Sequence, residues 1–312
     1  VGQFRGGMSN PTFMVTDGSA KRYVMRKKPP GKLLPSAHAV DREYRVISAL
    51  AGTDVPVAKA YVLCEDEAVI GHDFYVMEHV EGRVIRDFSL PGMSPDDRHA
   101  HYAEMGRVMA ALHKVNWREQ GLEGYGREGG YCARQVKRCS TQYEASKTDD
   151  VPEMNKLIQW LFDHMPESEE TTIVHGDYRM ENTIFHPDGP EILAVIDWEL
   201  GTLGDPLSDL AYNCLNYHVP DPERADITHL DLKAHGILTE DEYVEAYCRA
   251  RNISRPSNWS FYLALSLFRL AAIAQGVYKR GLDGNASSPE ALKRGAKARQ
   301  LAEVGWKIAA AS

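Results

Sequence analysis

The feature that most constrains this chain is the stretch at residues 173–211, which reads IVHGDYRMENTIFHPDGPEILAVIDWELGTLGDPLSDLA. Short β-branched runs at 171–174, 183–186 and 192–196 predict three strands, and the turn signal PDGP separates the last two. The loops that leave the first and last of these strands carry polar side chains. We therefore expect the strands to direct both loops into one cavity.

Three of these polar side chains, Asp177, Asn182 and Asp197, are the residue types that phosphoryl transfer from a magnesium nucleotide requires. That reaction has a loose transition state, so a protein mainly positions the reactants and neutralises charge. One carboxylate orients the attacking hydroxyl group, and a second carboxylate with an amide oxygen binds Mg²⁺. The sequence predicts Asp177 in the first role, with Asn182 and Asp197 as metal ligands.

The spacing of these residues supports the prediction. The pattern His-x-Asp-x-x-x-x-Asn at 175–182, followed by Ile196 and Asp197, resembles the catalytic and metal loops of the protein-kinase-like superfamily. The alternative is that these Asp and Asn residues only form turns and helix caps after the strands. We expect Asp209 to brace the catalytic loop and not to react.

Near the start of the chain, the runs at 12–15 and 22–26 flank a turn signal and predict a β-hairpin. The loop before the hairpin contains two glycines, Ser9 and Asn10. Because glycine has no side chain, such a loop can bring backbone N–H groups against phosphates. We expect Ser9 and Asn10 to bind nucleotide, although the loop taken alone also fits a plain turn.

Arg26 lies at the end of the second strand, where kinases keep the cation that contacts the α- and β-phosphates. Lys27 or Lys28 would take this role if the strand register differs, and a solvated basic edge is the alternative. A helix predicted at 38–50 carries Glu43 beside its apolar stripe. We expect Glu43 to pair with Arg26 in the nucleotide site; its alternative role is a surface charge.

A second hairpin is predicted from the runs at 60–64 and 69–77, which completes a small lobe of about five strands. The apolar strand then enters a polar, glycine-containing segment, so we expect a hinge at about 75–82. Backbone groups near Glu78 and Val80 are expected to pair with adenine.

The expected domain division places the nucleotide-binding lobe at 1–78 and a mainly helical catalytic and substrate-binding lobe at 79–312. Helices of this second lobe are predicted after the capping signal at 94–97, at 151–165, after the capping signal at 239–242, at 259–280 and at 289–311. They would wall a substrate pocket. Arg269, Lys279 and Arg280 are available to an anionic substrate, but a solvated role is favoured for all three.

Composition excludes several function classes. Lys and Arg total 36 against 44 acidic residues, a net charge of −8, which argues against a general nucleic-acid or membrane-surface binder. Five scattered cysteines without a C-x-x-C indicate neither a disulfide framework nor a zinc site, so we expect a reducing cytoplasm. The most apolar segment, 263–277, is too short and interrupted to span a bilayer. Patterned sequence starts close to Val1, which suggests that the natural protein begins earlier.

With these motifs in place, the chain resembles the aminoglycoside phosphotransferase and choline kinase superfamily over nearly its whole length. Several segments are similar to the kinase-like domain of acyl-CoA dehydrogenase family members 10 and 11 and their bacterial stand-alone relatives. These segments are SNPTF at 9–13, YVMRKKPPGKLLPSAHAVDREYRV at 23–46, FYVMEHVEGRV at 74–84, HGDYRMEN at 175–182 and FRLAAIAQGVYKRGLDGNASS at 268–288.

The resemblance implies an α+β, bilobal protein-kinase-like fold, with a small antiparallel β-sheet lobe that contains one helix and a larger, mainly helical lobe. It implies ATP and Mg²⁺ as cofactors and a small-molecule hydroxyl acceptor, for which a hydroxyacyl-CoA or related hydroxy acid is favoured over an antibiotic. Arg179 falls where protein kinases place a lysine near the γ-phosphate, so we expect it to offset charge during catalysis. A functional link to an acyl-CoA dehydrogenase is also implied.

The chain departs from protein kinases where peptide substrates are handled. His-Gly-Asp replaces His-Arg-Asp, Asp-Trp-Glu replaces Asp-Phe-Gly, and no Ala-Pro-Glu motif follows. Three alternatives remain open. They are an aminoglycoside- or choline-type kinase, a nucleotide-binding pseudokinase that serves an acyl-CoA dehydrogenase, and a metal phosphohydrolase suggested by the pair His72-Asp73.

Overall fold

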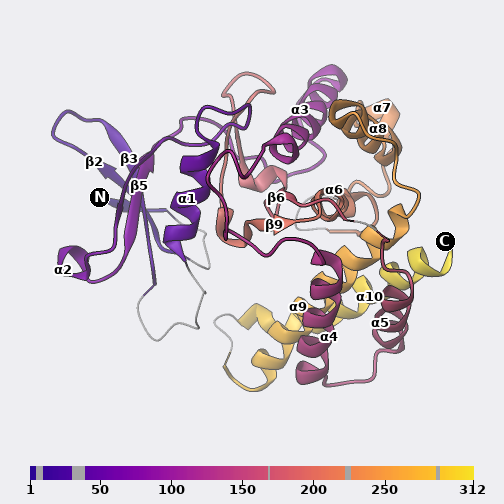
Figure 1. Cartoon of the computed structure of the whole chain (residues 1–312). Helices are drawn as coiled ribbons and strands as arrows, with labels where there is room; N and C mark the ends of the chain where they lie inside the picture. Colours follow the sequence, from indigo (N-terminus) through magenta and orange to yellow (C-terminus); the bar gives the residue numbers. More distant parts are fainter. Residues whose placement is uncertain (5–9, 30–38, 168, 222–225, 286–288) are drawn as a thin grey trace.

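The computed structural model describes residues 1–4, 10–29, 39–167, 169–221, 226–285 and 289–312. Ser9 of the expected phosphate loop lies outside these residues. Figure 1 shows two lobes, with the strands of a small sheet and helix α1 at one end and a group of helices at the other. The expected bilobal α+β fold is confirmed.

The small lobe is built on one antiparallel sheet of five strands in the order β1-β2-β3-β5-β4. The strands are β1 (Gly2–Gln3), β2 (Thr12–Thr16), β3 (Arg22–Lys27), β4 (Ala60–Cys64) and β5 (Phe74–Glu78). The first predicted hairpin is β2 with β3, and Asp17 forms its turn by accepting from the backbone of Ser19 at 2.8 Å and Lys21 at 3.0 Å. This geometry makes β3 the central strand of the sheet.

The second predicted hairpin is wrong in part, because residues 69 and 70 do not belong to a strand. They end a short helix, α2 (Glu67–Ile70), between β4 and β5. Asp66 caps this helix by accepting from the backbone of Ala68 at 2.9 Å, and Gly71 ends it with φ 82°. The apolar pair Val69-Ile70 suggests a strand, but the caps on either side favour one helical turn.

Helix α1 (Val40–Leu50) packs on the sheet with Val40, Ile47 and Leu50 buried, as its apolar spacing predicts. The predicted start of this helix, at residue 38, lies outside the described residues. Glu43 is 1% exposed, which is unusual for an acidic side chain and requires a partner.

The chain that leaves β5 contacts the large lobe from Gly82 onward. A Cβ on Gly82 would meet the Phe185 carbonyl oxygen at 2.3 Å, so only glycine allows this approach. The backbones of Arg83 and Phe185 exchange two hydrogen bonds of 2.8 Å. The Arg83 side chain donates to the carbonyls of His186 and Gly189, both at 2.9 Å.

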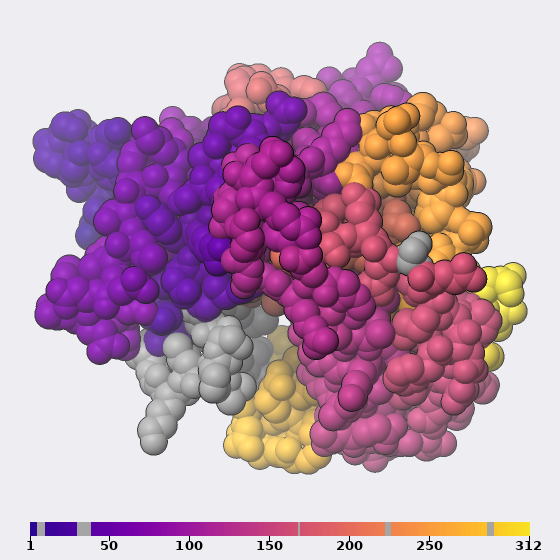
Figure 2. Space-filling view, viewed as in Figure 1, coloured from indigo at the N-terminus to yellow at the C-terminus, as the bar shows by residue number. Residues whose placement is uncertain are grey.

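The large lobe is mainly helical. Its helices of one turn or more are α3 (Pro95–Lys114), α4 (Tyr131–Ser146), α5 (Pro152–Asp163), α6 (Pro206–Asn213), α7 (Leu232–His235), α8 (Glu240–Arg251), α9 (Trp259–Leu282) and α10 (Arg294–Ala310). The sequence prediction left α4 unassigned. α9 packs against α4, α6 and α10, and in the view of Figure 2 residues of α4 form the surface over it. By length and composition α9 would suit a membrane, but 72% of its most apolar window is buried within the protein, as in a core helix.

Two small antiparallel pairs carry the loops of interest. β6 (Thr172–Val174) pairs with β9 (Thr202–Gly204), and β7 (Thr183–Phe185) pairs with β8 (Ile192–Val195). The three strands predicted here are confirmed, whereas β9 was not predicted. The loops after β6 and β8 therefore leave one compact region between the lobes.

Candidate active site

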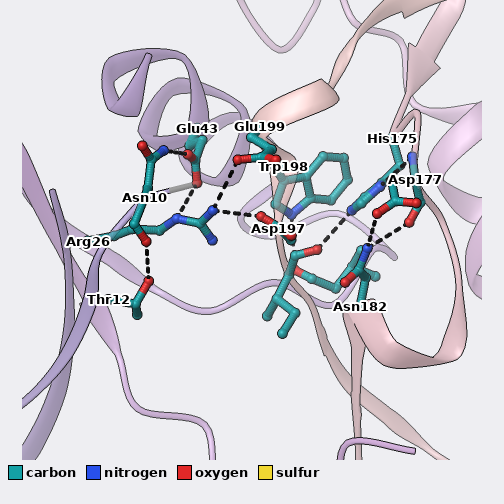
Figure 3. Close-up of polar contacts among 12 residues, drawn as sticks. Asn10, Thr12, Arg26, Glu43, His175, Asp177, Asn182, Asp197, Trp198 and Glu199 are labelled. Carbon is teal, nitrogen blue, oxygen red and sulfur yellow. Dashed lines mark hydrogen bonds and ion pairs between the residues drawn. The ribbon is translucent and has the colours of Figure 1, made fainter. Parts of the chain in front are cut away.

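The loop after β6 closes on itself through Asn182. The Asn182 amide nitrogen donates to the Asp177 carboxylate at 2.9 Å and to the Asp177 backbone carbonyl at 2.8 Å. Asp197, at the end of the loop after β8, follows Ile196, whose N–H donates to the Asn182 carbonyl at 2.9 Å. Figure 3 shows Asp197 with Asn182 and Asp177 on one side and Arg26 on the other. The structure thus brings together the three polar residues that the sequence singled out.

Asp209 braces the backbone of this loop, as expected. It is 2% exposed and accepts from the backbone N–H groups of His175 at 2.5 Å and Gly176 at 2.8 Å. Burial acts to raise the pKa of Asp209, but His113 and His175 outweigh it and hold that pKa below its ordinary value. His113 is buried against Asp209 and Tyr247 and so helps to hold the Asp209 carboxylate in place.

Gly176 explains why this loop lacks the arginine of protein kinases. Its φ is +80°, and a Cβ there would lie 2.9 Å from the Leu200 carbonyl oxygen. A side chain would be strained by the backbone conformation and would also meet the neighbouring loop.

His175 connects the two loops. Its Nδ1 accepts from the Asp177 N–H at 3.2 Å, so the ring proton is on Nε2, which donates to the Ile196 carbonyl at 2.9 Å. The Trp198 ring packs on the imidazole with centroids 4.7 Å apart. Asp177 and Asp197 therefore keep a fixed relative position.

Arg26 reaches this site from the small lobe. Its guanidinium lies 2.6 Å from Asp197 Oδ1 and 3.1 Å from Glu43 Oε2 (Figure 3). Glu43 also accepts from the Asn10 amide at 2.6 Å and from the Tyr75 hydroxyl at 3.1 Å. The side chain of Asn10 thus supports Glu43. Burial acts to lower the pKa of Arg26. The neighbouring Glu43, Tyr75 and Asp197 outweigh this effect and raise that pKa above its ordinary value.

The two neighbouring lysines have other contacts. The Lys27 ammonium lies 5.8 Å from the centre of the Phe13 ring. Lys28 forms an ion pair with Asp73. The strand register therefore turns Arg26 toward Asp197. Asp73, which with His72 had suggested a phosphohydrolase, is the partner of Lys28 in this ion pair.

Two features of the second loop escaped sequence reasoning. Asp197 has φ +66° and ψ +54°, a left-handed conformation that non-glycine residues adopt rarely and mostly at functional sites. Glu199 lies 3.7 Å from the Arg26 guanidinium and brings a third carboxylate to this cation, after Glu43 and Asp197. The motif Asp-Trp-Glu was noted only as a departure from Asp-Phe-Gly.

Arg179 contacts the Asp177 loop directly. Its guanidinium lies 3.2 Å from Asp177 Oδ2 and 3.3 Å from Glu181 Oε2. It also lines a cavity beside Asp177. The structure therefore places Arg179 against Asp177, the residue expected to orient the acceptor hydroxyl.

The expected adenine contacts lie where the two lobes join. Glu78 ends β5, and its backbone N–H donates to the Lys59 carbonyl at 2.8 Å. That donor is used by Lys59, so the expected base contact would use the other backbone groups near Glu78 and the half-buried Val80.

A cavity of about 360 Å³ opens beside Asp177 between α3, α6, α9 and α10. Most of its lining is apolar, including Met105, Met180, Leu215, Leu270, Ile273 and Val277. Its charged lining residues are the three cations Arg179, Arg294 and Lys297 and the single acid Asp221. Two of these cations have acidic partners: Arg179 pairs with Asp177 and Glu181, and Lys297 pairs with Asp221 at 3.9 Å. The cavity therefore suits a molecule with an apolar part, and Arg294 brings a positive charge to its wall.

Two residues of the site were missed or misjudged. The Tyr212 hydroxyl donates to Asp177 Oδ1 at 2.5 Å, although nothing in the sequence indicated it. The solvated role favoured for Arg269 is wrong: its guanidinium donates to the Gly176 carbonyl at 2.5 Å and lies 5.3 Å from the centre of the Tyr212 ring. The middle of the long helix α9 lies against the catalytic loop. Arg269, in that part of the helix, therefore contacts the loop and is not solvated.

Known proteins share this architecture. A crystal structure from Ralstonia eutropha JMP134, described as a candidate aminoglycoside phosphotransferase, is 49% identical with a TM-score of 0.92 and covers 99% of this chain and 92% of its own. An aminoglycoside phosphotransferase solved as a ternary complex with AMP-PNP and hygromycin B has a TM-score of 0.67 at 17% identity, covering 99% and 94%.

A curated relative extends well beyond the matched region. Mouse acyl-CoA dehydrogenase family member 10 is 46% identical over 309 residues, which are 98% of this chain but only 29% of the relative's length. A family model described as the phosphotransferase enzyme family matches residues 1–257. The chain therefore belongs to the phosphotransferase enzyme family, within its aminoglycoside-phosphotransferase-like small-molecule kinases.

Proposed function

We propose that this protein transfers the γ-phosphoryl group of ATP, bound with Mg²⁺, to a hydroxyl group of a hydroxyacyl-CoA or a related hydroxy acid. The observation that carries the proposal is the convergence of Asp177, Asn182 and Asp197 beside the buried Arg26–Glu43 pair. Phosphoryl transfer needs this combination of a base, oxygen ligands and a phosphate-binding cation.

The donor set fits a hard divalent cation. The Asn182 amide nitrogen is used by Asp177, so the amide oxygen is the group left for a ligand. Asp197 offers a carboxylate that is 34% exposed, and Arg26 holds one of its oxygens. Carboxylate and amide oxygens are the ligands Mg²⁺ prefers, and when bound it would neutralise charge on the β- and γ-phosphates.

The other residues take roles that follow from their contacts. Asp177 orients the acceptor hydroxyl and accepts its proton, while Arg179 offsets negative charge next to it. Arg26 binds the α- and β-phosphates, and Glu43 holds it in place with help from Asn10. Backbone groups near Glu78 and Val80 pair with adenine. An AMP-PNP complex of a structural neighbour supports a nucleoside triphosphate as donor.

The acceptor proposal rests on the cavity beside Asp177. An aminoglycoside is a polycation, whereas the lining of this cavity is mostly apolar. An acyl chain would fill the apolar part, and the anionic groups of CoA or a free carboxylate would meet Arg294. The name of the mouse relative supports a link to acyl-CoA metabolism. We further propose a cytoplasmic location and a functional link to an acyl-CoA dehydrogenase.

The test is to incubate the protein with Mg·ATP and a panel of hydroxyacyl-CoAs, free hydroxy acids, choline and hygromycin B. Mass spectrometry is expected to find an acyl product heavier by one phosphoryl group, absent without Mg²⁺ and absent with Asp177→Asn. Phosphorylation of choline or hygromycin B alone would refute the acceptor assignment. ATP binding without any product across the panel would instead favour a nucleotide-binding module without kinase activity.

A further inference from the structure

The catalytic-loop carboxylate has a partner that lies outside its own loop. Tyr212, near the end of α6, donates its hydroxyl to Asp177 Oδ1 at 2.5 Å. Asn182 and Arg179 contact the other carboxylate oxygen, Oδ2, at 2.9 and 3.2 Å. Both oxygens of Asp177 are therefore held, and they are held from different elements of the fold.

Tyr212 is itself fixed by Arg269 of α9. The Arg269 guanidinium lies over the Tyr212 ring, with 5.3 Å between its central carbon and the ring centre. The same guanidinium donates to the Gly176 carbonyl, one residue before Asp177, at 2.5 Å. Burial and the neighbouring Asp177 raise the pKa of Tyr212, so its phenol stays protonated and donates.

This arrangement matters because the last torsion of an aspartate side chain is soft. Rotation of a carboxylate about its Cβ–Cγ bond has broad minima, so hydrogen bonds decide which lone pair faces a substrate. A carboxylate oxygen can accept more than one hydrogen bond, and the Tyr212 bond leaves Oδ1 with capacity for another. Tyr212 also lines the cavity beside Asp177, so its hydroxyl lies where the base and the proposed acceptor meet.

We propose that Tyr212, held by Arg269, is a positioning residue that sets the plane of the Asp177 carboxylate against the acceptor hydroxyl. The inference rests on the proposed kinase function and assigns a task to two residues that the kinase-like motifs do not include. It also connects α9, which forms one wall of the acceptor cavity through Leu270 and Ile273, to the reacting group.

The test is Tyr212→Phe, which keeps the ring that Arg269 contacts and removes only the hydroxyl. A misdirected base should lower kcat roughly 10- to 100-fold while KM for ATP stays within about twofold. Tyr243→Phe is the matched control, because Tyr243 is a buried tyrosine of α8 whose hydroxyl has no hydrogen-bond partner among the described residues. That variant should keep the wild-type kcat.

Acceptor-independent hydrolysis of ATP, measured in the same samples, should fall in parallel in Tyr212→Phe, because water must use the same base. This readout separates two failures. A wild-type protein that phosphorylates none of the offered hydroxyacyl compounds would count against the proposed acceptor. The ATP hydrolysis rates of wild type and Tyr212→Phe would still test the positioning role of Tyr212. Unchanged rates in Tyr212→Phe would overturn the positioning role. A rise in KM for ATP as large as the fall in kcat would overturn it too.

The part played by Arg269 is tested with a double variant. Arg269→Lys keeps the positive charge but loses the guanidinium that lies over Tyr212 and donates to the Gly176 carbonyl. If the two residues act as one unit, the double variant should have a kcat within about twofold of that of the slower single variant. Fully multiplicative losses would show that Arg269 acts independently of Tyr212, and Tm values for all four proteins would reveal any loss of folding.

Discussion

The side-chain amide of Asn182 donates to both the carboxylate and the backbone carbonyl of Asp177, at 2.9 and 2.8 Å. A proposed metal ligand and a proposed base thus hold each other, five residues apart in one loop. Because the Asn182 amide nitrogen donates within the loop, the Asn182 amide oxygen is the atom that remains to bind a cation. This relationship explains why the residue is an amide, since a carboxylate could not donate to Asp177.

Replacing the base should abolish transfer without preventing nucleotide binding. Asp177→Asn keeps the shape of the side chain but removes its ability to take a proton, and loss of a general base lowers turnover by about 10²- to 10⁴-fold. ATP binding measured by calorimetry should stay close to that of the wild type. Asp188→Asn, on the exposed turn between β7 and β8, is the control and should change neither quantity. Normal turnover in Asp177→Asn would exclude this residue from the mechanism.

Glu43→Gln should act mainly on ATP binding. The buried carboxylate lies 3.1 Å from Arg26 and accepts two further hydrogen bonds, so its neutral analogue leaves Arg26 held by Asp197 and the more distant Glu199. A lost charge-assisted hydrogen bond should raise KM for ATP about tenfold or more. Initial rates over an ATP series measure this effect. A fall in kcat at an unchanged KM would show that Glu43 is not a phosphate-site residue.

Gly176→Ala should destabilise the catalytic loop by more than the strain of its left-handed backbone conformation alone would cause. Alanine at φ +80° costs about 1–2 kcal/mol, and its Cβ would also lie 2.9 Å from the Leu200 carbonyl. Gly124→Ala is a matched control, because Gly124 has φ +74° with nothing within 4 Å of the added carbon. We expect Gly176→Ala to lower both Tm and kcat further than the control does. Equal effects would mean that Leu200 moves aside.

The local part of this site was predictable from the sequence, and the reason is the range of its contacts. Asp177 and Asn182 are joined within one loop, so their spacing carries the geometry. The expected pairing of Glu43 with Arg26 was correct because strand, helix and motif order all agreed. A contact between residues 177 and 212, or between 176 and 269, leaves no periodic or spacing signal in a single sequence.

The errors in the fold have a similar physical origin. The helix α4 was left unassigned because its buried face consists mostly of tyrosine and cysteine, with Val136 as its single aliphatic residue. Residues 69 and 70 read as strand from their β-branched side chains, while Asp66 and Gly71 set helical caps around them. Capping outweighed intrinsic preference in α2, and burial of one helix face did so in α4.

Stability should fall as pH rises from about 4 to about 7 because of Asp205. Burial raises the pKa of Asp205 to about 7, despite hydrogen bonds from the Leu207 backbone and the Tyr262 hydroxyl. Between about pH 4 and pH 7 the folded protein keeps a proton that the unfolded chain has lost, so raising the pH favours unfolding, by up to about 4 kcal/mol. Asp205→Asn can still accept from Leu207 and cannot ionise. The drop in Tm from pH 5.5 to pH 8 should therefore be smaller in the variant, and an equal drop would assign it to other groups.

The length of the acceptor should be controlled by Tyr217. Its side chain lines the cavity beside Asp177 and also a second cavity of about 290 Å³, whose apolar lining includes Ile227, Leu230 and Leu232. Tyr217 therefore stands between the two spaces, and its buried hydroxyl has no hydrogen-bond partner among the described residues, so packing alone holds it. Truncation should join the cavities.

Tyr217→Ala is then expected to lower KM for long-chain hydroxyacyl acceptors relative to short ones, while KM for ATP stays unchanged. Each methylene newly accommodated in an apolar space contributes about 0.8 kcal/mol, so two or more should shift the preference at least tenfold. Tyr217→Phe keeps the wall and should keep the wild-type chain-length profile. A uniform loss across all chain lengths would mean that the cavities stay separate and that Tyr217 only supports the fold.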